Sequence, residues 1–370
     1  MPRLFYGNFD FEEQLHATPG QRRPAAMERL VQELTFGFLG VSTAEDRIWC
    51  PASLPATYLD QLEASGWPHD HFVSHPSQLP SGLTLEPWGW SNAAIRFGEQ
   101  WGLQMKPPPL DLVRYANSRE FSARCESADP LHPSRLCRST DEVQAFLRSR
   151  QADSRWVIKA NWSHAARERI LGNGPDLDPA AEAWLRQRLS RDGMVCAEFW
   201  LERVTEFGVQ WQIDGPAATS APKLVAITEL LVDPRGQYMG TRFLNLADPI
   251  AAAVIPAANA TLPVVRELAQ RGYRGPVGID VMRYRVDGQE QVRPFQDINA
   301  RWTMGRLAAG WFARHLAMAT SDAPLPTAMA WLHGSESRVR ELAPGARWIP
   351  TSPERLDNRP VGHRTWLMIE

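Results

Sequence analysis

The spacing of apolar residues predicts a chain in which helices and strands alternate. Residues 24–38 carry apolar side chains at helical spacing. Residues 156–160 and 194–201 are compact apolar runs of strand length. A further helix is expected to begin after Asp178, which precedes a proline, and to end at Gly193.

The middle of the chain follows a strand pattern. Residues 207–213, 223–231 and 236–243 are apolar or alternate between apolar and polar, as strands of an antiparallel sheet do. Helices are expected at 263–270 and 306–318, where the apolar spacing becomes helical again. These patterns predict a fold of mixed α/β and α+β class.

Three consecutive prolines at 107–109 predict a stiff, extended connector. We therefore expect a domain boundary just after this segment. The length of 370 residues also favours two or three domains, because a domain has roughly 150 residues.

The segment 293–305 carries an unusual row of polar side chains. It is predicted to be a strand, so Asp297, Asn299 and Arg301 lie on one face. Upstream, Asp280 lies in a second short apolar run, and Asp287-Gly288 between the two runs is typical of a hairpin turn. The hairpin would bring Asp280 toward Asp297 and Asn299.

These residue types suit a phosphate-binding site. Carboxylate and amide oxygens are ligands for Mg²⁺, which is often shared with substrate phosphates. A guanidinium binds anions in bidentate geometry. An ordinary hairpin with a solvated polar face is the alternative, and it would be the better interpretation if these residues stood alone.

Composition and charge argue against several classes of protein. The formal net charge of −2 argues against a nucleic-acid binder. No apolar run reaches membrane-spanning length, and the N-terminus lacks the apolar core of a signal peptide. The four cysteines are scattered, which is typical of free thiols in the cytoplasm.

The order of charged residues along the predicted elements resembles the ATP-grasp superfamily. Lys159 lies within an apolar strand, Glu198 lies on a later strand, and the hairpin follows. The sequence from Asp297 to Arg301 resembles the family's E-x-N-x-R signature, and the resemblance spans roughly residues 115–318.

The resemblance implies roles for these residues. Arg119, Lys159 and Glu198 would bind the nucleotide. Asp280, Asp297 and Asn299 would hold Mg²⁺. Arg301 would be the catalytic residue that faces the substrate carboxylate or the transferred phosphate.

The resemblance also implies a layout and an activity. The chain would comprise a pre-ATP-grasp-like α/β domain (1–114), a small subdomain (115–200), a large subdomain with the metal site (201–320) and a C-terminal extension (321–370). It would use ATP and Mg²⁺ to join a small-molecule or peptide carboxylate to an amine through an acyl phosphate, with no nucleic-acid or membrane partner. Ligases of this superfamily are often dimers, so a homodimer is an expectation from the resemblance.

This sequence departs from the family pattern at three places. Asp297 stands where the signature has glutamate, and Arg119 stands where the family has lysine. The phosphate-covering loop, 161–167, has no glycine. Two alternatives therefore stay open, a small-molecule kinase that uses the same site and a nucleotide-binding protein without turnover.

Overall fold

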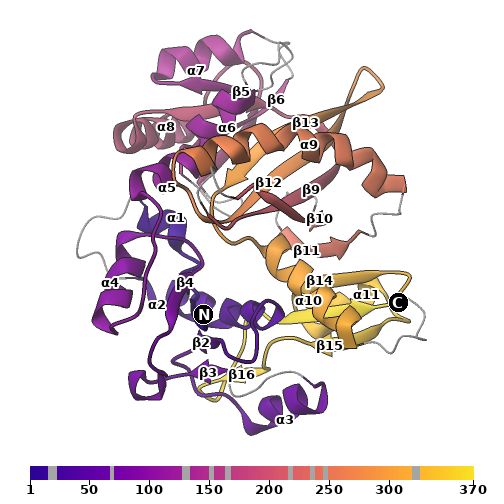
Figure 1. The fold of residues 1–370 in the computed structure, drawn as a ribbon. Coiled ribbons are helices and arrows are strands. Elements are labelled where there is room, and N and C mark those ends of the chain that lie inside the picture. The colour runs from indigo at the N-terminus through magenta and orange to yellow at the C-terminus, as the bar shows by residue number, and fades with distance from the viewer. Residues whose placement is uncertain are drawn as a thin grey trace.

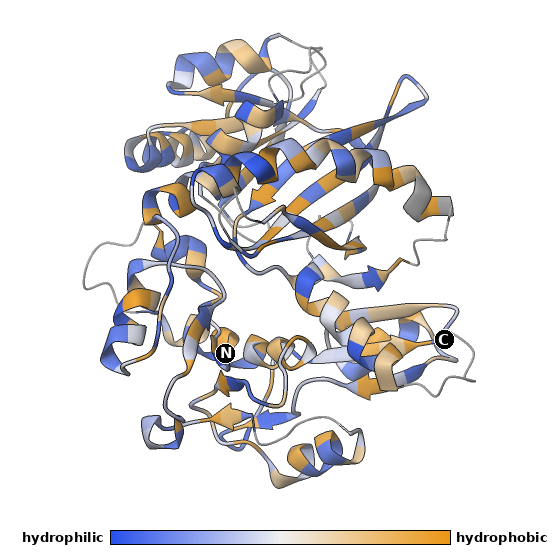
Figure 2. Cartoon of the chain, in the orientation of Figure 1, coloured by the Kyte–Doolittle hydropathy of each residue, from blue (hydrophilic) through white to orange (hydrophobic). Residues whose placement is uncertain are grey.

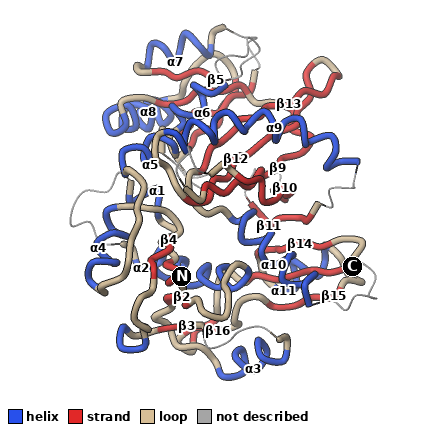
Figure 3. The backbone as a smooth tube through the Cα atoms, in the orientation of Figure 1, coloured by secondary structure: helices blue, strands red, loops and turns tan. Residues whose placement is uncertain are grey.

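The computed structural model describes residues 1–15, 23–66, 71–126, 134–149, 154–162, 168–215, 220–233, 238–244, 249–318 and 326–370. Within these residues, the strands form sheets of four, eight and four strands and one two-stranded ribbon (Figures 1 and 3). In Figure 1, the β9, β10, β12 and β13 portion of the eight-stranded sheet lies between the other two parts of the molecule, whereas β14 and β15 lie beside the N-terminal part.

A parallel four-stranded sheet forms the N-terminal part. Its order is β3-β2-β1-β4, and Leu4 and Phe5 on the central strand are fully buried. Burial on both faces is typical of parallel strands. The strands are β1 (Arg3–Tyr6), β2 (Arg47–Trp49), β3 (Phe72–Val73) and β4 (Thr84–Pro87). The helices of this part are α1 (Phe11–Gln14), α2 (Ala25–Leu34), α3 (Ala56–Ala64) and α4 (Asn92–Gln100), with 3-10 turns at Thr35–Gly40 and Pro76–Gln78.

An antiparallel sheet of order β5-β8-β6-β7 follows. Two helices, α7 and α8, pack with it around a separate small core that includes Trp156, Ile158 and Leu185. The strands are β5 (Ser134–Cys137), β6 (Arg155–Ala160), β7 (Arg169–Asn173) and β8 (Val195–Phe199). The helices are α5 (Leu110–Ala116), α6 (Arg119–Glu126), α7 (Thr140–Leu147) and α8 (Pro179–Asp192), of which α5 and α6 lead in from the N-terminal part.

The end residues of α8 agree with the sequence prediction. The Asp178 side chain accepts a hydrogen bond from the N–H of Ala181, which satisfies one free donor of the first turn. Gly193 ends the helix with φ of +75°, a left-handed conformation that favours glycine.

The largest sheet is antiparallel and has the order β13-β12-β9-β10-β11-β14-β18-β15. Polar and apolar residues alternate along part of the sheet, as in the second half of β9, whereas β14 and β18 are almost entirely apolar and buried (Figure 2). The strands are β9 (Glu202–Ile213), β10 (Lys223–Val232), β11 (Tyr238–Phe243), β12 (Gly275–Val286), β13 (Gln289–Asn299), β14 (Met329–His333), β15 (Arg347–Pro350) and β18 (Thr365–Ile369). The remaining elements are α9 (Pro249–Gln270), α10 (Met304–Met318), α11 (Glu336–Leu342) and the ribbon of β16 (Arg355–Leu356) and β17 (Arg359–Pro360).

The helix expected at 263–270 is longer than predicted. It is the end of α9, which begins at Pro249 and contains Pro256 and Pro263 inside the helix. An internal proline removes one helical hydrogen bond, so we expected the helix to start there. The contacts of α9 with β9, β12 and β13 outweigh that loss.

The N-terminal part and the large sheet share one continuous hydrophobic core. Phe38, Trp302 and Trp311 are members of it. The Thr35–Gly40 turn lies so close to α10 that a Cβ added at Gly310 would be 2.6 Å from the carbonyl oxygen of Gly40. Because rigid packing joins the two parts, residues near the N-terminus can contact the strands of the large sheet.

The four-part division of the chain stays a prediction. The predicted C-terminal extension (321–370) contributes β14, β18 and β15, which continue the eight-stranded sheet beyond β11. No helix in the described part of the chain combines the length and the apolar character that a membrane crossing needs.

Candidate active site

A cavity of about 470 Å³ lies between the β5–β8 sheet and the large sheet. It is lined by Arg119, Arg155, Val157, Lys159, Arg169, Glu198, Phe199, Trp200, Leu201, Glu202, Arg203, Glu206, Leu230, Val232, Tyr238, Asp280, Met282, Arg293, Gln296 and Asp297. Five of the seven residues predicted for the site are in this set. Asn299 and Arg301 are not among the lining residues that the structure describes.

The hairpin predicted from the sequence is formed by β12 and β13. Asp280 lies directly opposite Asp297 in the strand register, and Gly278 lies opposite Asn299. The turn has φ of +50° at Asp287 and +77° at Gly288, the left-handed values that this residue pair favours. The carboxylates of Asp280 and Asp297 therefore share one strand face, as expected.

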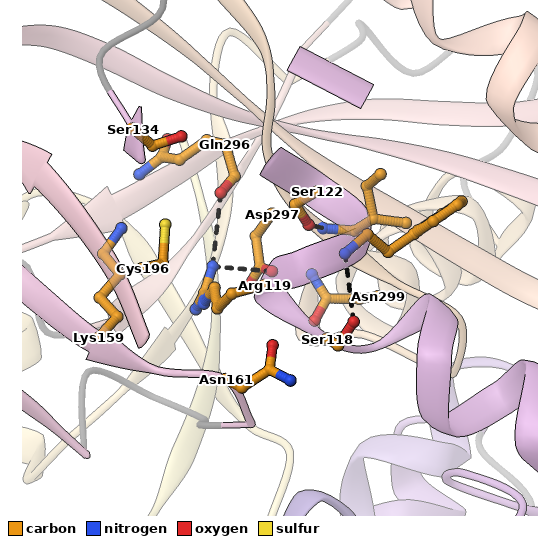
Figure 4. A network of polar contacts seen from close by, with 12 residues as sticks. Ser118, Arg119, Ser122, Ser134, Lys159, Asn161, Cys196, Gln296, Asp297 and Asn299 are labelled. Carbon is orange, nitrogen blue, oxygen red and sulfur yellow. Dashed lines mark hydrogen bonds and ion pairs between the residues drawn. The ribbon is translucent and has the colours of Figure 1, made fainter. Parts of the chain in front are cut away.

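Arg119 connects the first turn of α6 to this hairpin. Its Nη1 lies 2.9 Å from Oδ1 of Asp297 and also donates to the carbonyl oxygen of Gln296 at 3.4 Å. The backbone N–H of Arg119 donates to the carbonyl oxygen of Asn161, which follows β6. Figure 4 shows the guanidinium of Arg119 directed at Asp297 and Gln296. Arg119 thus lies where the two sheets meet.

Lys159 and Glu198 lie on neighbouring strands, β6 and β8, and form an ion pair of 2.8 Å. This contact explains how a lysine fits into an apolar strand, because a paired charge can be buried at lower cost. The sequence analysis assigned both residues to the nucleotide but did not predict that they pair with each other.

Arg293 is a site residue that the sequence analysis missed. Its guanidinium donates to Glu198 at 3.1 and 3.2 Å and also binds Glu126 at the end of α6. Its place in the same predicted strand as Asp297 was a usable signal, although the register of β13 shifts between the two residues. Burial raises the pKa of Glu198, but the charges of Arg293 and Lys159 more than offset this and hold the pKa well below its usual range.

Arg301 is held by the N-terminal part of the chain. Its guanidinium forms an ion pair with Glu12 of α1 and donates to the Trp302 carbonyl oxygen at 2.8 Å and to Oδ1 of Asn299 at 2.9 Å. It also lies over the Trp88 ring, 5.3 Å from the centroid. Arg301 therefore orients Asn299 and joins the hairpin to the N-terminal part.

The donor set fits a hard divalent cation such as Mg²⁺. Burial, followed by the negative charges of Asp297 and Glu206, raises the pKa of Asp280 to about 8. Such crowding of carboxylates favours binding of a cation, and oxygen ligands suit Mg²⁺. Asp280 and Asp297 would hold the ion, with Asn299 as the predicted third ligand. No group of three His, Cys, Asp or Glu side chains in the described part of the chain is arranged to hold a metal ion, so the site offers two carboxylates and would depend on the Asn299 amide for a third ligand.

Asp280 should make the protein less stable as the pH rises. Burial and the neighbouring carboxylates raise the pKa of its carboxyl from 3.8 in the unfolded chain to about 8 in the folded protein. Between these values the folded state binds more protons, so the free energy of unfolding decreases as the pH increases. Asp280→Asn should therefore raise the stability in metal-free buffer at pH 8 by several kcal/mol, with about 5 kcal/mol as the upper bound set by the full pKa shift, measured by thermal unfolding from pH 4 to 8. A variant that follows the wild-type curve would contradict this expectation.

The rest of the cavity wall combines cations with apolar surface. Arg155, Arg169 and Arg203 add positive charge, and Phe199 and Leu201 supply apolar atoms. A polyanion with one aromatic end, such as a nucleoside triphosphate, matches this combination. Of the predicted phosphate-covering loop 161–167, residues 163–167 lie outside the described residues.

No family model matches the sequence. One curated relative, the [butirosin acyl-carrier protein]–L-glutamate ligase of Niallia circulans, is 36% identical over 83 residues. That match covers 22% of this chain and only 18% of the relative, so the chain matches a small part of that protein.

Solved structures resemble this chain over most of its length. The N5-carboxyaminoimidazole synthetase of Staphylococcus aureus, complexed with ADP, has a TM-score of 0.51 at 12% identity and covers 90% of both chains. The biotin carboxylase domain of the Hydrogenobacter thermophilus 2-oxoglutarate carboxylase, complexed with ADP and its magnesium salt, has a TM-score of 0.53 at 12% identity and covers 85% of this chain and 73% of that one. These likenesses confirm, at the level of fold, the resemblance expected from the sequence: this chain has the fold of the ATP-grasp superfamily.

Proposed function

We propose that this protein is an ATP- and Mg²⁺-dependent ligase that joins a carboxylate to an amine through an acyl phosphate. One observation carries the proposal. In a chain with the ATP-grasp fold, two cations, Arg119 and Lys159, and two carboxylates, Asp280 and Asp297, converge on one cavity. The partial match to a ligase that acts on L-glutamate supports a ligation reaction.

In the proposed first step, Lys159 and Arg119 bind the phosphates of ATP and neutralise their charge. A substrate carboxylate attacks the γ-phosphorus, which gives an acyl phosphate and ADP. Mg²⁺, held by Asp280, Asp297 and Asn299, would neutralise charge on the phosphates. Phosphoryl transfer of this kind depends mainly on positioning and electrostatics, so no side-chain nucleophile is required.

In the second step, an amine attacks the acyl carbon, loses a proton and expels inorganic phosphate. Arg301 is the predicted residue that steadies the carboxylate or the acyl phosphate. Its contact with Glu12 is compatible with this role, because the same ion pair fixes the direction of the guanidinium. The identity of the acid and the amine, and a homodimeric state, stay predictions from the resemblance.

ATP binding is the first property to test. Calorimetric titration of the purified protein with a non-hydrolysable ATP analogue should show binding that Mg²⁺ strengthens. Lys159→Ala should weaken that binding by about 10- to 100-fold, because charge-assisted contacts to phosphate contribute about 1.5–3 kcal/mol each. Glu198 keeps Arg293 as a partner in this variant, so the fold should remain.

Lys223→Ala is a matched control, because this exposed lysine pairs with Asp214 and is not part of the described cavity lining. Absence of binding with and without Mg²⁺ would refute the proposed function. Incubation with ATP, a carboxylate and an amine separates the two alternatives. A phosphorylated acceptor without a condensed product would indicate a kinase, and tight ATP binding without release of ADP would indicate a protein without turnover.

A further inference from the structure

Four charged side chains form a connected, nearly buried network at one wall of the cavity. Glu198 is at its centre and contacts Lys159 at 2.8 Å and Arg293 at 3.1 Å through the same oxygen, Oε2. Arg293 also contacts Glu126, whose Oε2 accepts a hydrogen bond from Ser134. The side chains of Glu198, Arg293 and Glu126 are each 5% exposed, and that of Lys159 is 12% exposed.

The network joins the two sheets that enclose the cavity. Lys159 and Glu198 belong to the β5–β8 sheet, whereas Arg293 belongs to β13 of the large sheet. The guanidinium of Arg293 uses two of its nitrogens for Glu198, and Nε and Nη2 both contact Glu126. Arg293 is thus fixed from both sides, while Lys159 has Glu198 as its ion-pair partner.

The pairing of Lys159 raises a question that the proposed function does not answer. When Lys159 turns its ammonium group toward a nucleotide phosphate, its contact with Glu198 is weakened or lost. A buried carboxylate left without a cation is costly, so the loss of that partner would oppose nucleotide binding. A second, permanent cation on Glu198 removes this obstacle.

We propose that Arg293 is a positioning residue that holds the charge of Glu198 so that Lys159 can move from Glu198 to a nucleotide phosphate. Glu126 keeps Arg293 in place during this exchange, since it occupies the other edge of the guanidinium. The inference deepens the proposed function and rests on it, because it requires that Lys159 binds ATP. Arg293 would therefore affect nucleotide binding indirectly, because it contacts Glu198, and Glu198 contacts Lys159.

Binding of the non-hydrolysable analogue adenylyl imidodiphosphate with Mg²⁺ tests the exchange. In Arg293→Lys, a single ammonium cannot bind both carboxylates as the guanidinium does. Glu198 then retains Lys159, and the dissociation constant should rise by about tenfold or more. Glu198→Gln removes the charge that competes for Lys159, so its own dissociation constant is the reference against which the double variant is compared.

The double variant Glu198→Gln/Arg293→Lys shows whether Arg293 helps Lys159 to leave Glu198 or only supports the fold. If Arg293 acts through the charge of Glu198, the double variant should return to within about threefold of Glu198→Gln. If Arg293 only supports the fold, the double variant should bind at least as weakly as Arg293→Lys, which would overturn the inference. The conservative swaps Glu336→Gln and Arg340→Lys, singly and together, are the matched control, because they alter an exposed Glu–Arg pair on α11.

Two outcomes separate the inference from the proposed function. A wild-type protein that does not bind the analogue refutes the proposed function, and the inference falls with it. Binding by the wild type without rescue in the double variant refutes the inference alone. If Arg293→Lys does not fold, as judged by its melting curve, the comparison of the double variant with Glu198→Gln still decides. A dissociation constant of the double variant more than about tenfold above that of Glu198→Gln, at an unchanged melting temperature, contradicts a role of Arg293 through the charge of Glu198.

Discussion

Replacing Asp297 by asparagine should lower Mg²⁺-dependent ADP release by at least about 100-fold while the fold remains intact. Asp297 is one of two carboxylates that face each other across β12 and β13, and the only anionic partner within ion-pair distance recorded for Arg119 among the described residues. The neutral amide keeps the shape of the side chain but removes the charge that a divalent cation requires. Steady-state release of ADP with carboxylate and amine substrates measures the effect.

The stability of Asp297→Asn should change little. The ion pair with Arg119 is partly exposed, at 14% and 23% for the two side chains, so its loss should cost about 1 kcal/mol or less. Asp287→Asn in the exposed turn of the same hairpin is the matched control, because asparagine also tolerates the φ of +50° there. Wild-type turnover in Asp297→Asn would remove this residue from the proposed metal site.

Replacing Arg301 by methionine should destabilise the protein by about 3–5 kcal/mol and abolish turnover. The side chain of Glu12 is only 5% exposed and would lose its cation. The Asn299 oxygen and the Trp302 carbonyl would lose a donor at the same time. Thermal unfolding measures the first effect, and ADP release under conditions where the variant is folded measures the second.

A second substitution separates the structural role of Arg301 from its predicted catalytic role. In Glu12→Gln/Arg301→Met the buried charge is absent, so most of the lost stability should return. Turnover should stay absent if Arg301 acts on the substrate. Turnover that returns together with stability would show that Arg301 serves only to join the hairpin to the N-terminal part.

Local features of the sequence predicted a large part of the fold. The helix from Asp178 to Gly193 and the hairpin around Asp287-Gly288 depend on capping and turn geometry, which adjacent residues determine. The predicted start of α9 was wrong. An internal proline indicates a helix start when only neighbouring residues are considered, whereas packing against the large sheet decides that α9 begins at Pro249. Predictions from local pattern are reliable only where tertiary contacts do not outweigh them.

The sequence by itself determined which residue types the site could contain and that a hairpin would bring Asp280 toward Asp297. The exact pairing of Asp280 with Asp297 depends on a register shift between Asp280 and Met282, which the turn sequence does not encode. Only the tertiary structure decided which charges pair. Glu12 and Arg301 are 289 residues apart, and Glu126 and Arg293 are 167 apart. A buried ion pair depends on which faces the sheets and helices present to each other, and no local sequence signal encodes that choice. The partners of Arg301, Lys159 and Glu198 therefore became visible only when the N-terminal part and the two sheets were packed together.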